Sequence, residues 1–363
     1  MLNHVKVLDL TRVLAGPLCT MTLADMGADV LKIERPQGGD ETRGWGPPFD
    51  DAGQSAYYLS VNRNKLSAAL DIDDASDRNL LEALLGGADV VVENFRPGVL
   101  GRRGFDPASM RAKFPRLIWC TITGFADDPG RPGYDFVVQA ESGWMSITGE
   151  PEGAPMKHGV ALADVIAGKD AAIAVLGALV ERARTEVGAS LTVSLDRCAE
   201  AALVNIAQNA LVSGVAPTRW GNAHANLVPY QLFDASDRPI VIAVGSDAQW
   251  LSCANALGLD HLAQDPALRT NAGRLSNRAR IVEVIRARVR EQAAGEWRER
   301  LDAVGVPSGV VRTVMEVLSE SGGSSLTGMP PSVPGAVRRR PPRLGEHTSL
   351  VRANGWEAFR VAL

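Results

Sequence analysis

The sequence predicts an α/β protein in which a large domain with an open, mostly parallel sheet is followed by a smaller α+β domain. Three observations lead there. The chain has 363 residues, which is enough for about two domains of ~150 residues. Short apolar runs alternate with helical segments over the first 213 residues, as in a parallel sheet. From residue 214 the pattern changes to turns, a hairpin and further helices.

The first elements form a βαβ unit. Residues 5–10 and 30–33 are apolar runs typical of parallel strands, and residues 18–26 between them are helical. A Rossmann-like arrangement is therefore expected. The turn after the first strand reads TRVLAGP and lacks the GxGxxG fingerprint, which argues against a bound dinucleotide.

The remaining elements follow in order. In the large domain, helices are expected over 80–85 and 165–185 and from an N-capping Asp196 to about 213, and strands over 88–93, 117–122 and 191–195. Residues 214–229 are expected to be a linker. The small domain should span 230–310, with a hairpin of 230–233 and 239–244 and helices over 247–257, 277–292 and 296–304. Residues 311–343, rich in Ser, Gly, Pro and Arg, predict a return linker.

The charge, the apolar runs and the distribution of cysteines and histidines exclude several classes of function. The formal charge is −4, which gives no reason to expect nucleic acid as a partner. The sequence has no run of 18 apolar residues, so it predicts no membrane span. The first residues do not resemble a signal peptide, so we expect a cytoplasmic protein. The four cysteines and five histidines are scattered, which predicts neither disulfides nor a metal site. Carboxylates are then the leading candidates for chemistry.

Three loops place cations after predicted strands. They contain Arg35, Lys65 and the pair Arg96 and Arg102. Ligands of open α/β sheets bind at the carboxyl ends of the strands, where Arg and Lys suit a phosphorylated ligand. The alternative is that these are ordinary solvated loop charges.

Motifs along nearly the whole chain carry a family resemblance. They are VLDLTRVLAGP, GADVLKIERP, GDETRGWGPPF, YYLSVNRNK, ADVVVENFRPGVL, PGYDFVVQAESGWMSITG, GVALADVIAG, RWGNAHANLVPYQLF and LGEHT. The chain resembles the class III coenzyme A transferases, and most closely those that act on dicarboxylates such as succinate or glutarate. One departure is the segment 315–343, which is shorter than is usual in that family.

The resemblance implies that Asp164 is the nucleophile of a CoA-transferase. It would form aspartyl anhydrides and an aspartyl-CoA thioester while CoA moves from an acyl-CoA donor, such as succinyl-CoA, to a carboxylic acid. No metal or cofactor beyond coenzyme A itself is implied. Asp164 falls near the start of the predicted helix, so we expect the helix N-terminus to keep it ionised. Without the resemblance, Asp164 reads as an N-cap.

The resemblance also assigns a binding site and an assembly. The residues implied to contact coenzyme A are Val13, Leu14, Ala15, Arg35, Lys65, Asn94, Phe95 and Arg102. Tyr134 would lie beside the active site and Asp247 over the acyl pocket, although a helix cap is the competing interpretation of Asp247. Residues 344–363 would rejoin the large domain of residues 1–213, and the protein would be an interlocked homodimer.

Two other functions stay open. One is a 2-methylacyl-CoA racemase of the same fold, which needs a base on each face of the α-carbon. This chain has Tyr134 where the racemases have histidine, and a tyrosine with an ordinary pKa near ~10 is a poor base. The other is a non-catalytic acyl-CoA-binding protein, against which the presence of Asp164 argues.

Overall fold

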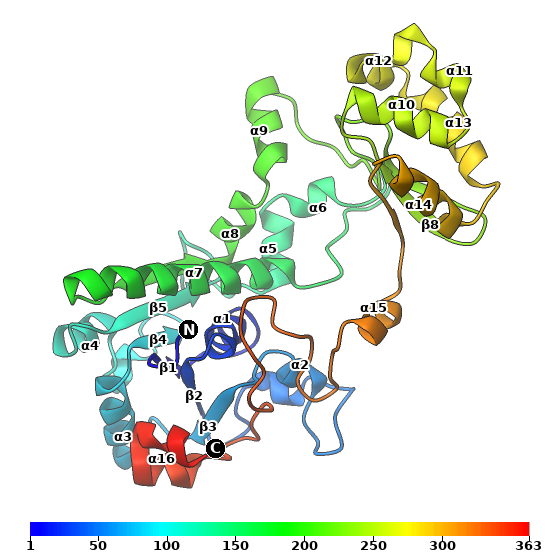
Figure 1. Cartoon of the computed structure of the whole chain (residues 1–363). Coiled ribbons are helices and arrows are strands. Elements are labelled where there is room, and N and C mark those ends of the chain that lie inside the picture. The colour runs from blue at the N-terminus through cyan, green and yellow to red at the C-terminus, as the bar shows by residue number, and fades with distance from the viewer. Residues whose placement is uncertain (363) are drawn as a thin grey trace. The chain divides into compact units, whose positions relative to one another are not determined.

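The structure of the protein is a computed structural model that describes residues 1–362. Two compact units are present (Figure 1). The first comprises residues 1–145, 157–215 and 318–362, and the second comprises residues 146–156 and 216–317. The chain therefore leaves the first unit twice and returns to it each time. No helix among residues 1–362 has the length and apolarity needed to cross a bilayer.

The first unit is built on a six-stranded parallel sheet. Its strands are β1 (Lys6–Asp9), β2 (Asp29–Glu34), β3 (Lys65–Ala69), β4 (Val90–Glu93), β5 (Ile118–Thr123) and β6 (Ser190–Ser194). They are ordered β3-β2-β1-β4-β5-β6. The sequence order therefore reverses between β1 and β4, where Leu8 pairs with Val91. Such a reversal opens a crevice at the carboxyl ends of the two strands. The prediction of a Rossmann-like parallel sheet is confirmed.

Helices cover both faces of the sheet (Figure 1). Val7 and Val90 belong to one buried cluster and their neighbours Leu8 and Val91 to the other, because successive strand side chains point to opposite faces. The helices on the first face include α1 (Ala15–Asp25), α5 (Asp135–Glu141), α7 (Leu162–Thr185) and α8 (Leu195–Ala201). The second face carries α3 (Ala75–Gly86), α4 (Pro107–Lys113), α16 (Thr348–Asn354) and α17 (Ala358–Val361).

The predicted helix from Asp196 to residue 213 is two helices in the structure. Ser194 occupies the N-cap position of α8 without a side-chain hydrogen bond, and α9 (Val204–Ser213) follows separately. The Asp196 carboxylate accepts hydrogen bonds from the backbone N–H of Ala126, at 3.1 and 3.2 Å. The expectation that Asp196 caps the helix was therefore wrong, because this side chain binds a distant loop. The expectation of a single helix was also wrong, since α8 ends at Ala201 and α9 begins at Val204.

Part of the predicted return linker is firmly attached to the first unit. Arg63 forms a buried ion pair with Asp25 and also donates to the carbonyl oxygen of Thr327, at 3.0 Å. Arg338 donates to the carbonyl oxygens of Ala24 and Ala28, at 2.9 and 3.0 Å. These contacts fix residues 327–338 beside α1 and β3, where the sequence predicted a surface linker.

The second unit has its own sheet and core. The antiparallel strands β7 (Tyr230–Asp234), β8 (Pro239–Ala243) and β9 (Ser308–Val310) carry the helices α10 (Asp247–Ala256), α12 (Asn271–Ser276), α13 (Arg278–Val289) and α14 (Ala294–Ala303). β7 and β8 form the predicted hairpin, in which Phe233 pairs with Ile240. The completely buried Trp250 and Trp297 fill the core between sheet and helices.

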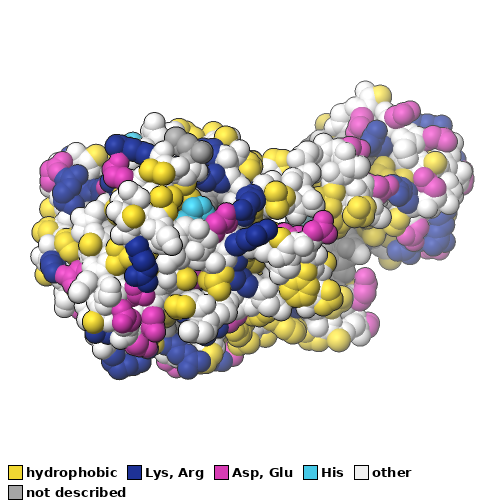
Figure 2. All heavy atoms as spheres, turned by 90° about the horizontal axis from the view of Figure 1, so that it is seen from below, with side chains coloured by type: hydrophobic (Ala, Val, Ile, Leu, Met, Phe, Trp, Pro, Cys, Tyr) yellow, Lys and Arg dark blue, Asp and Glu magenta, His cyan; other side chains and the backbone are white. Residues whose placement is uncertain are grey.

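Acidic and basic side chains are interspersed on the face of the molecule shown in Figure 2. This mixture agrees with a formal charge of −4 spread over 38 basic and 42 acidic residues.

Candidate active site

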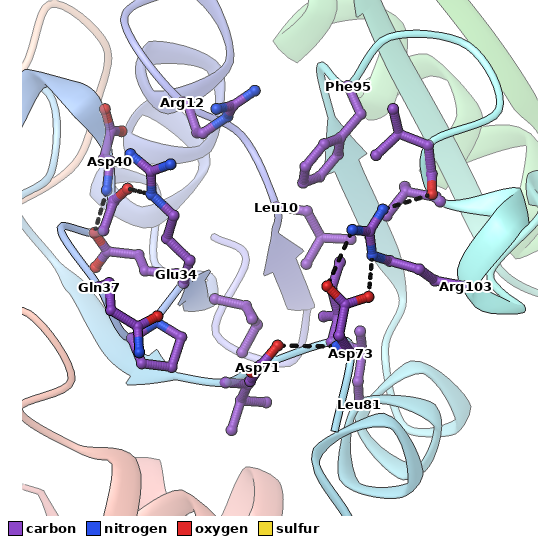
Figure 3. A pocket seen from close by; sticks show the side chains of 18 of the residues that line it. Leu10, Arg12, Glu34, Gln37, Asp40, Asp71, Asp73, Leu81, Phe95 and Arg103 are labelled. Carbon is purple, nitrogen blue, oxygen red and sulfur yellow. Dashed lines mark hydrogen bonds and ion pairs between the residues drawn. The ribbon is translucent and has the colours of Figure 1, made fainter. Parts of the chain in front are cut away.

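Two cavities lie in the first unit at the carboxyl ends of the strands. The Asp164 cavity, of about 410 Å³, is lined by residues that include Val13, Leu14, Ala15, Asn94, Phe95, Tyr134 and Asp164. The Arg35 cavity, of about 530 Å³, is lined by residues that include Leu10, Arg35, Leu70, Asp73 and Arg103 (Figure 3). Arg12, Phe95 and Arg96 line both, so the two cavities are neighbours along one crevice.

The loop between β1 and α1 forms one wall of the Asp164 cavity and is held from two sides. Asn94 accepts a hydrogen bond from the Arg12 N–H (3.0 Å) and donates to the Arg12 carbonyl oxygen (2.8 Å). Val13 has a φ of 72°, which is an outlier for a β-branched residue. Its N–H donates to Asp40 at 3.3 Å. The Asn94 amide, expected to contact coenzyme A, therefore positions the loop that lines the cavity.

A buried cluster of charges lies beneath this loop. The Asp9 carboxylate accepts hydrogen bonds from Thr11 N–H (2.9 Å) and Lys65 Nζ (2.9 Å). Lys32 donates to the carbonyl oxygen of Thr11 (2.7 Å) and pairs with Asp40 at 3.1 Å. Burial by itself would raise the pKa of Asp9, but the two ammonium groups lower it to about 2. The cluster ties the cavity wall to β1, β2 and β3.

Lys65 belongs to that cluster and not to either cavity. Its side chain is fully buried and also donates to the Pro17 carbonyl oxygen and to Asn62, each at 2.9 Å. Burial lowers the pKa of Lys65 to about 8, although Asp9 opposes the shift. All three ammonium protons are donated to groups within the protein. The structure therefore does not present Lys65 to a ligand phosphate, contrary to the expectation from the resemblance.

Asp164 lies in the first turn of α7, as predicted, but its electrostatic environment differs from the prediction. The carboxylate of Asp135 accepts hydrogen bonds from the Ala163 N–H (2.8 Å) and the Asp164 N–H (3.4 Å). Asp135 therefore occupies the helix N-terminus. Burial, with a further contribution from the negative charge of Asp135, raises the pKa of Asp164 to about 7. The expectation that the helix keeps Asp164 firmly ionised was wrong, since its charge is disfavoured by desolvation.

Asp135 is itself held in place. Its second carboxylate oxygen accepts a hydrogen bond from Gln139 (2.6 Å), and Gln139 in turn accepts one from the backbone N–H of His158 (2.9 Å). Asp135 and Gln139 are both buried. Within residues 1–362 no hydrogen bond reaches the carboxylate oxygens of Asp164. Asp164 is thus a buried carboxyl group that faces a cavity without a fixed partner.

Other predicted site residues have different places. Arg102 lies in the short helix η2 (Gly101–Arg103), but its neighbour Arg103 is the one that lines the Arg35 cavity. Asp247 belongs to the second unit and pairs with the buried Arg274 at 2.9 Å. Ser246, not Asp247, caps α10. The sequence predicted no role for Asp135, Arg12 or Arg103. Arg12 and Asp135 lie within the motifs VLDLTRVLAGP and PGYDFVVQAESGWMSITG, which were the available signal, whereas Arg103 lies outside every motif.

Residues 1–362 hold no group of three or more His, Cys, Asp or Glu side chains placed to bind a metal ion. Glu34 is the last residue of β2, the position at which a dinucleotide-binding protein carries the acidic residue that binds ribose. Its carboxylate instead accepts hydrogen bonds from Arg43 (2.7 Å) and Ser67 (2.7 Å). The site consists of a carboxyl group, arginine side chains and aromatic walls.

Comparison with known proteins agrees with the resemblance drawn from the motifs. Residues 2–348 match the family model described as CoA-transferase family III. The chain belongs to CoA-transferase family III. It is 39% identical to the succinyl-CoA:glutarate CoA-transferase of Mus musculus, over 96% of this chain and 84% of the mouse protein. It is 36% identical to the succinate–glutarate CoA-transferase of Agrobacterium fabrum, over 97% and 95% of the two chains.

A solved structure shares the whole fold. The CaiB/BaiF family protein from Brucella suis is 39% identical in sequence, with a TM-score of 0.84 over 97% of this chain and 98% of that one. The predicted family and enzyme class, a CoA-transferase, are therefore confirmed.

Proposed function

We propose that this enzyme transfers coenzyme A from succinyl-CoA to a dicarboxylic acid such as glutarate, with Asp164 as the nucleophile. The observation that carries the proposal is the Asp164 carboxyl group, which is buried, has no fixed partner and faces a cavity. The relatives named above are called succinyl-CoA:glutarate and succinate–glutarate CoA-transferases. Of the arginines that line the same cavity, Arg12 pairs with Glu41 and Arg131 with Glu141. Arg96 also lines it and suits the second carboxylate of such acids.

The shape of the crevice supports an acyl-CoA as the ligand. Coenzyme A joins a thiol-bearing arm to phosphorylated adenosine. With the thioester at Asp164, the arm would pass Phe95 and Arg96, which line both cavities, and the phosphates would enter the Arg35 cavity. The side chains of Arg12, Arg35, Arg96 and Arg103 line that cavity. This path assigns Val13, Leu14, Ala15, Phe95 and Arg35 to the ligand, as the resemblance predicts.

The chemistry needs only Asp164 and the thiol of the substrate. The ionised carboxylate attacks the thioester carbonyl and releases the CoA thiolate, leaving an aspartyl anhydride. The thiolate attacks the aspartyl carbonyl, which gives an aspartyl-CoA thioester and frees the donor acid. The acceptor carboxylate attacks this thioester and forms a second anhydride. The thiolate then attacks the acceptor's acyl carbon and regenerates Asp164. No group is consumed in the cycle.

The pKa of Asp164 has a role in this scheme. A carboxyl group with a pKa of about 7 is ionised in part at neutral pH, so the nucleophilic form is available. It is also a stronger nucleophile than an ordinary carboxylate of lower pKa, because nucleophilicity follows basicity.

Chemical trapping tests the proposal. After incubation with succinyl-CoA, borohydride should convert the Asp164 side chain of the trapped thioester to an alcohol, detected by mass spectrometry of the tryptic peptide. Asp164→Asn should abolish both trapping and transfer to glutarate. Asp170→Asn, further along α7 and outside the cavity, serves as the matched control. Full transfer activity in Asp164→Asn contradicts the proposal. Deuterium exchange at the α-carbon of a 2-methylacyl-CoA without acceptor acid would indicate the racemase instead.

We also propose that the enzyme is an interlocked homodimer. The first unit is made of three separate chain segments, and the segments of the second unit lie between them in sequence. The chain therefore passes between the two units four times, and a partner chain can thread between such crossing segments. Sedimentation at micromolar concentration should give a dimer, and a monomer there refutes this assembly.

A further inference from the structure

The arginines that line the Arg35 cavity differ in their partners. Arg12 pairs with Glu41, and Arg103 pairs with Asp73. Arg35 donates only to the carbonyl oxygen of Gly39, at 3.0 Å, within the described residues 1–362. Glu41 lies outside this cavity, whereas Asp73 is one of its lining residues. The Arg103 pair is therefore formed inside the cavity (Figure 3).

The geometry of this pair is a two-point fork. Arg103 Nε donates to one oxygen of Asp73 at 2.8 Å, and Nη2 donates to the other at 3.1 Å. The side chains are 30% and 66% exposed, so both can be reached from solvent. A phosphate group offers the same kind of paired acceptor oxygens to a guanidinium. Asp73 thus fills the position on Arg103 that a ligand phosphate would take.

The backbone holds Asp73 in that position. Its N–H donates to the Asp71 side chain at 3.0 Å, and its carbonyl oxygen accepts a hydrogen bond from Arg78 at 2.8 Å. The Arg103 hydrogen bond keeps the pKa of Asp73 below its ordinary value, and Asp73 raises the pKa of Arg103. Both groups are therefore charged at neutral pH. Because the backbone of Asp73 is already fixed by these hydrogen bonds, little conformational entropy is lost when its side chain binds Arg103.

We propose that Asp73 is an internal competitor of the ligand for Arg103 and thereby limits how tightly the enzyme holds coenzyme A esters. This inference rests on the proposed function, in which the phosphorylated end of the ligand enters the Arg35 cavity. A phosphate that binds Arg103 must displace the Asp73 carboxylate, and a phosphate beside the intact pair is attracted less than by a free guanidinium, because Asp73 neutralises the charge of Arg103. The competition weakens the binding of substrate and product esters alike, and weaker binding of the product favours its release.

The test is a gain of affinity. Asp73→Asn keeps the size of the side chain and removes its charge. Isothermal titration of the full-length protein with coenzyme A should give a dissociation constant about two to five times lower, since exposed ion pairs contribute little each. Asp127→Asn is the matched control, because Asp127 is an exposed partner of Arg197 (2.9 Å) outside both cavities. Its affinity should equal that of the wild type.

Two further measurements complete the test. Arg103→Gln should weaken binding, and the gain from Asp73→Asn should disappear in the double variant. Titration with dephospho-CoA, which lacks the 3′-phosphate, shows which phosphate competes with Asp73. If Asp73→Asn no longer raises the affinity for this ligand, the competitor is the 3′-phosphate. If the affinity still rises, the competitor is the diphosphate.

An unchanged or weaker affinity of Asp73→Asn overturns the inference while the proposed function stands, provided that the wild type binds coenzyme A. A wild type that does not bind coenzyme A at all overturns both.

Discussion

Replacing the Asp164 carboxyl group should make the protein more stable at alkaline pH than the wild type. The folded protein raises the pKa of Asp164 from the ordinary 3.8 to about 7. A carboxyl group whose pKa is raised by folding binds its proton more tightly in the folded state. Its contribution to stability is therefore lost as the pH rises from about 4 through about 7. Asp164→Asn lacks this titration and should not lose the same stability.

The magnitude follows from linkage. The interval from 3.8 to about 7 corresponds to about 4 kcal/mol of folding free energy at full ionisation, since each pH unit is worth ~1.4 kcal/mol. Part of this loss has already occurred at about pH 5, where the unfolded chain is ionised and the folded one is not. Between about pH 5 and about pH 8 the wild type should lose about 2–3 kcal/mol relative to Asp164→Asn.

Urea denaturation of both proteins at several pH values, at one protein concentration, measures this difference. Comparing the two proteins across pH cancels the constant effect of the substitution and the titration of all other groups. Asp127→Asn, which removes an exposed carboxylate, should run parallel to the wild type. Parallel curves for Asp164→Asn and the wild type from about pH 5 to about pH 8 would refute the reasoning that burial has raised the pKa.

Three other substitutions have definite expected outcomes. Asp135→Asn should lower the pH at which kcat/KM rises, because the neighbouring negative charge is removed while the burial of Asp164 remains; a pH–rate profile that does not move contradicts this. Lys65→Met should cost about 3–5 kcal/mol in urea denaturation by leaving Asp9 buried without its partner, and a large rise in KM for the CoA ester without loss of stability would instead support direct ligand contact. Arg63→Gln should speed chymotryptic cleavage after Leu326, because Thr327 and Met329 lose their hydrogen bonds to Arg63; mass spectrometry of the fragments measures the rate.

The secondary structure could be predicted well because its signals are local. Apolar runs such as Val90–Glu93 and the long helix Leu162–Thr185 have the periodicity of their own elements, and glycines and prolines mark their ends. The strand β3 (Lys65–Ala69) was missed, since its sequence KLSAA contains few β-formers. The helix break after Ala201 was missed as well, because no residue between Ala201 and Val204 is a helix breaker.

The site was predicted only in part for a related reason. The motif around Asp164 and the loop at Val13, Leu14 and Ala15 are each continuous in sequence, and the structure brings them into one cavity. Asp135, which caps the helix that carries Asp164, lies 29 residues away from it in the chain. Lys65 looked like a loop cation, but the strand that begins with it turns its ammonium group inward to Asp9.

The sequence by itself therefore determined the alternation of strands and helices, the membership of CoA-transferase family III and the location of Asp164 at the start of a helix. These properties follow from local periodicity and from contiguous motifs. Only the tertiary structure decided which charges are buried, which arginines line the cavities and that Asp164 has a pKa of about 7. Burial and through-space interaction depend on groups that are far apart in the chain, so no local pattern encodes them.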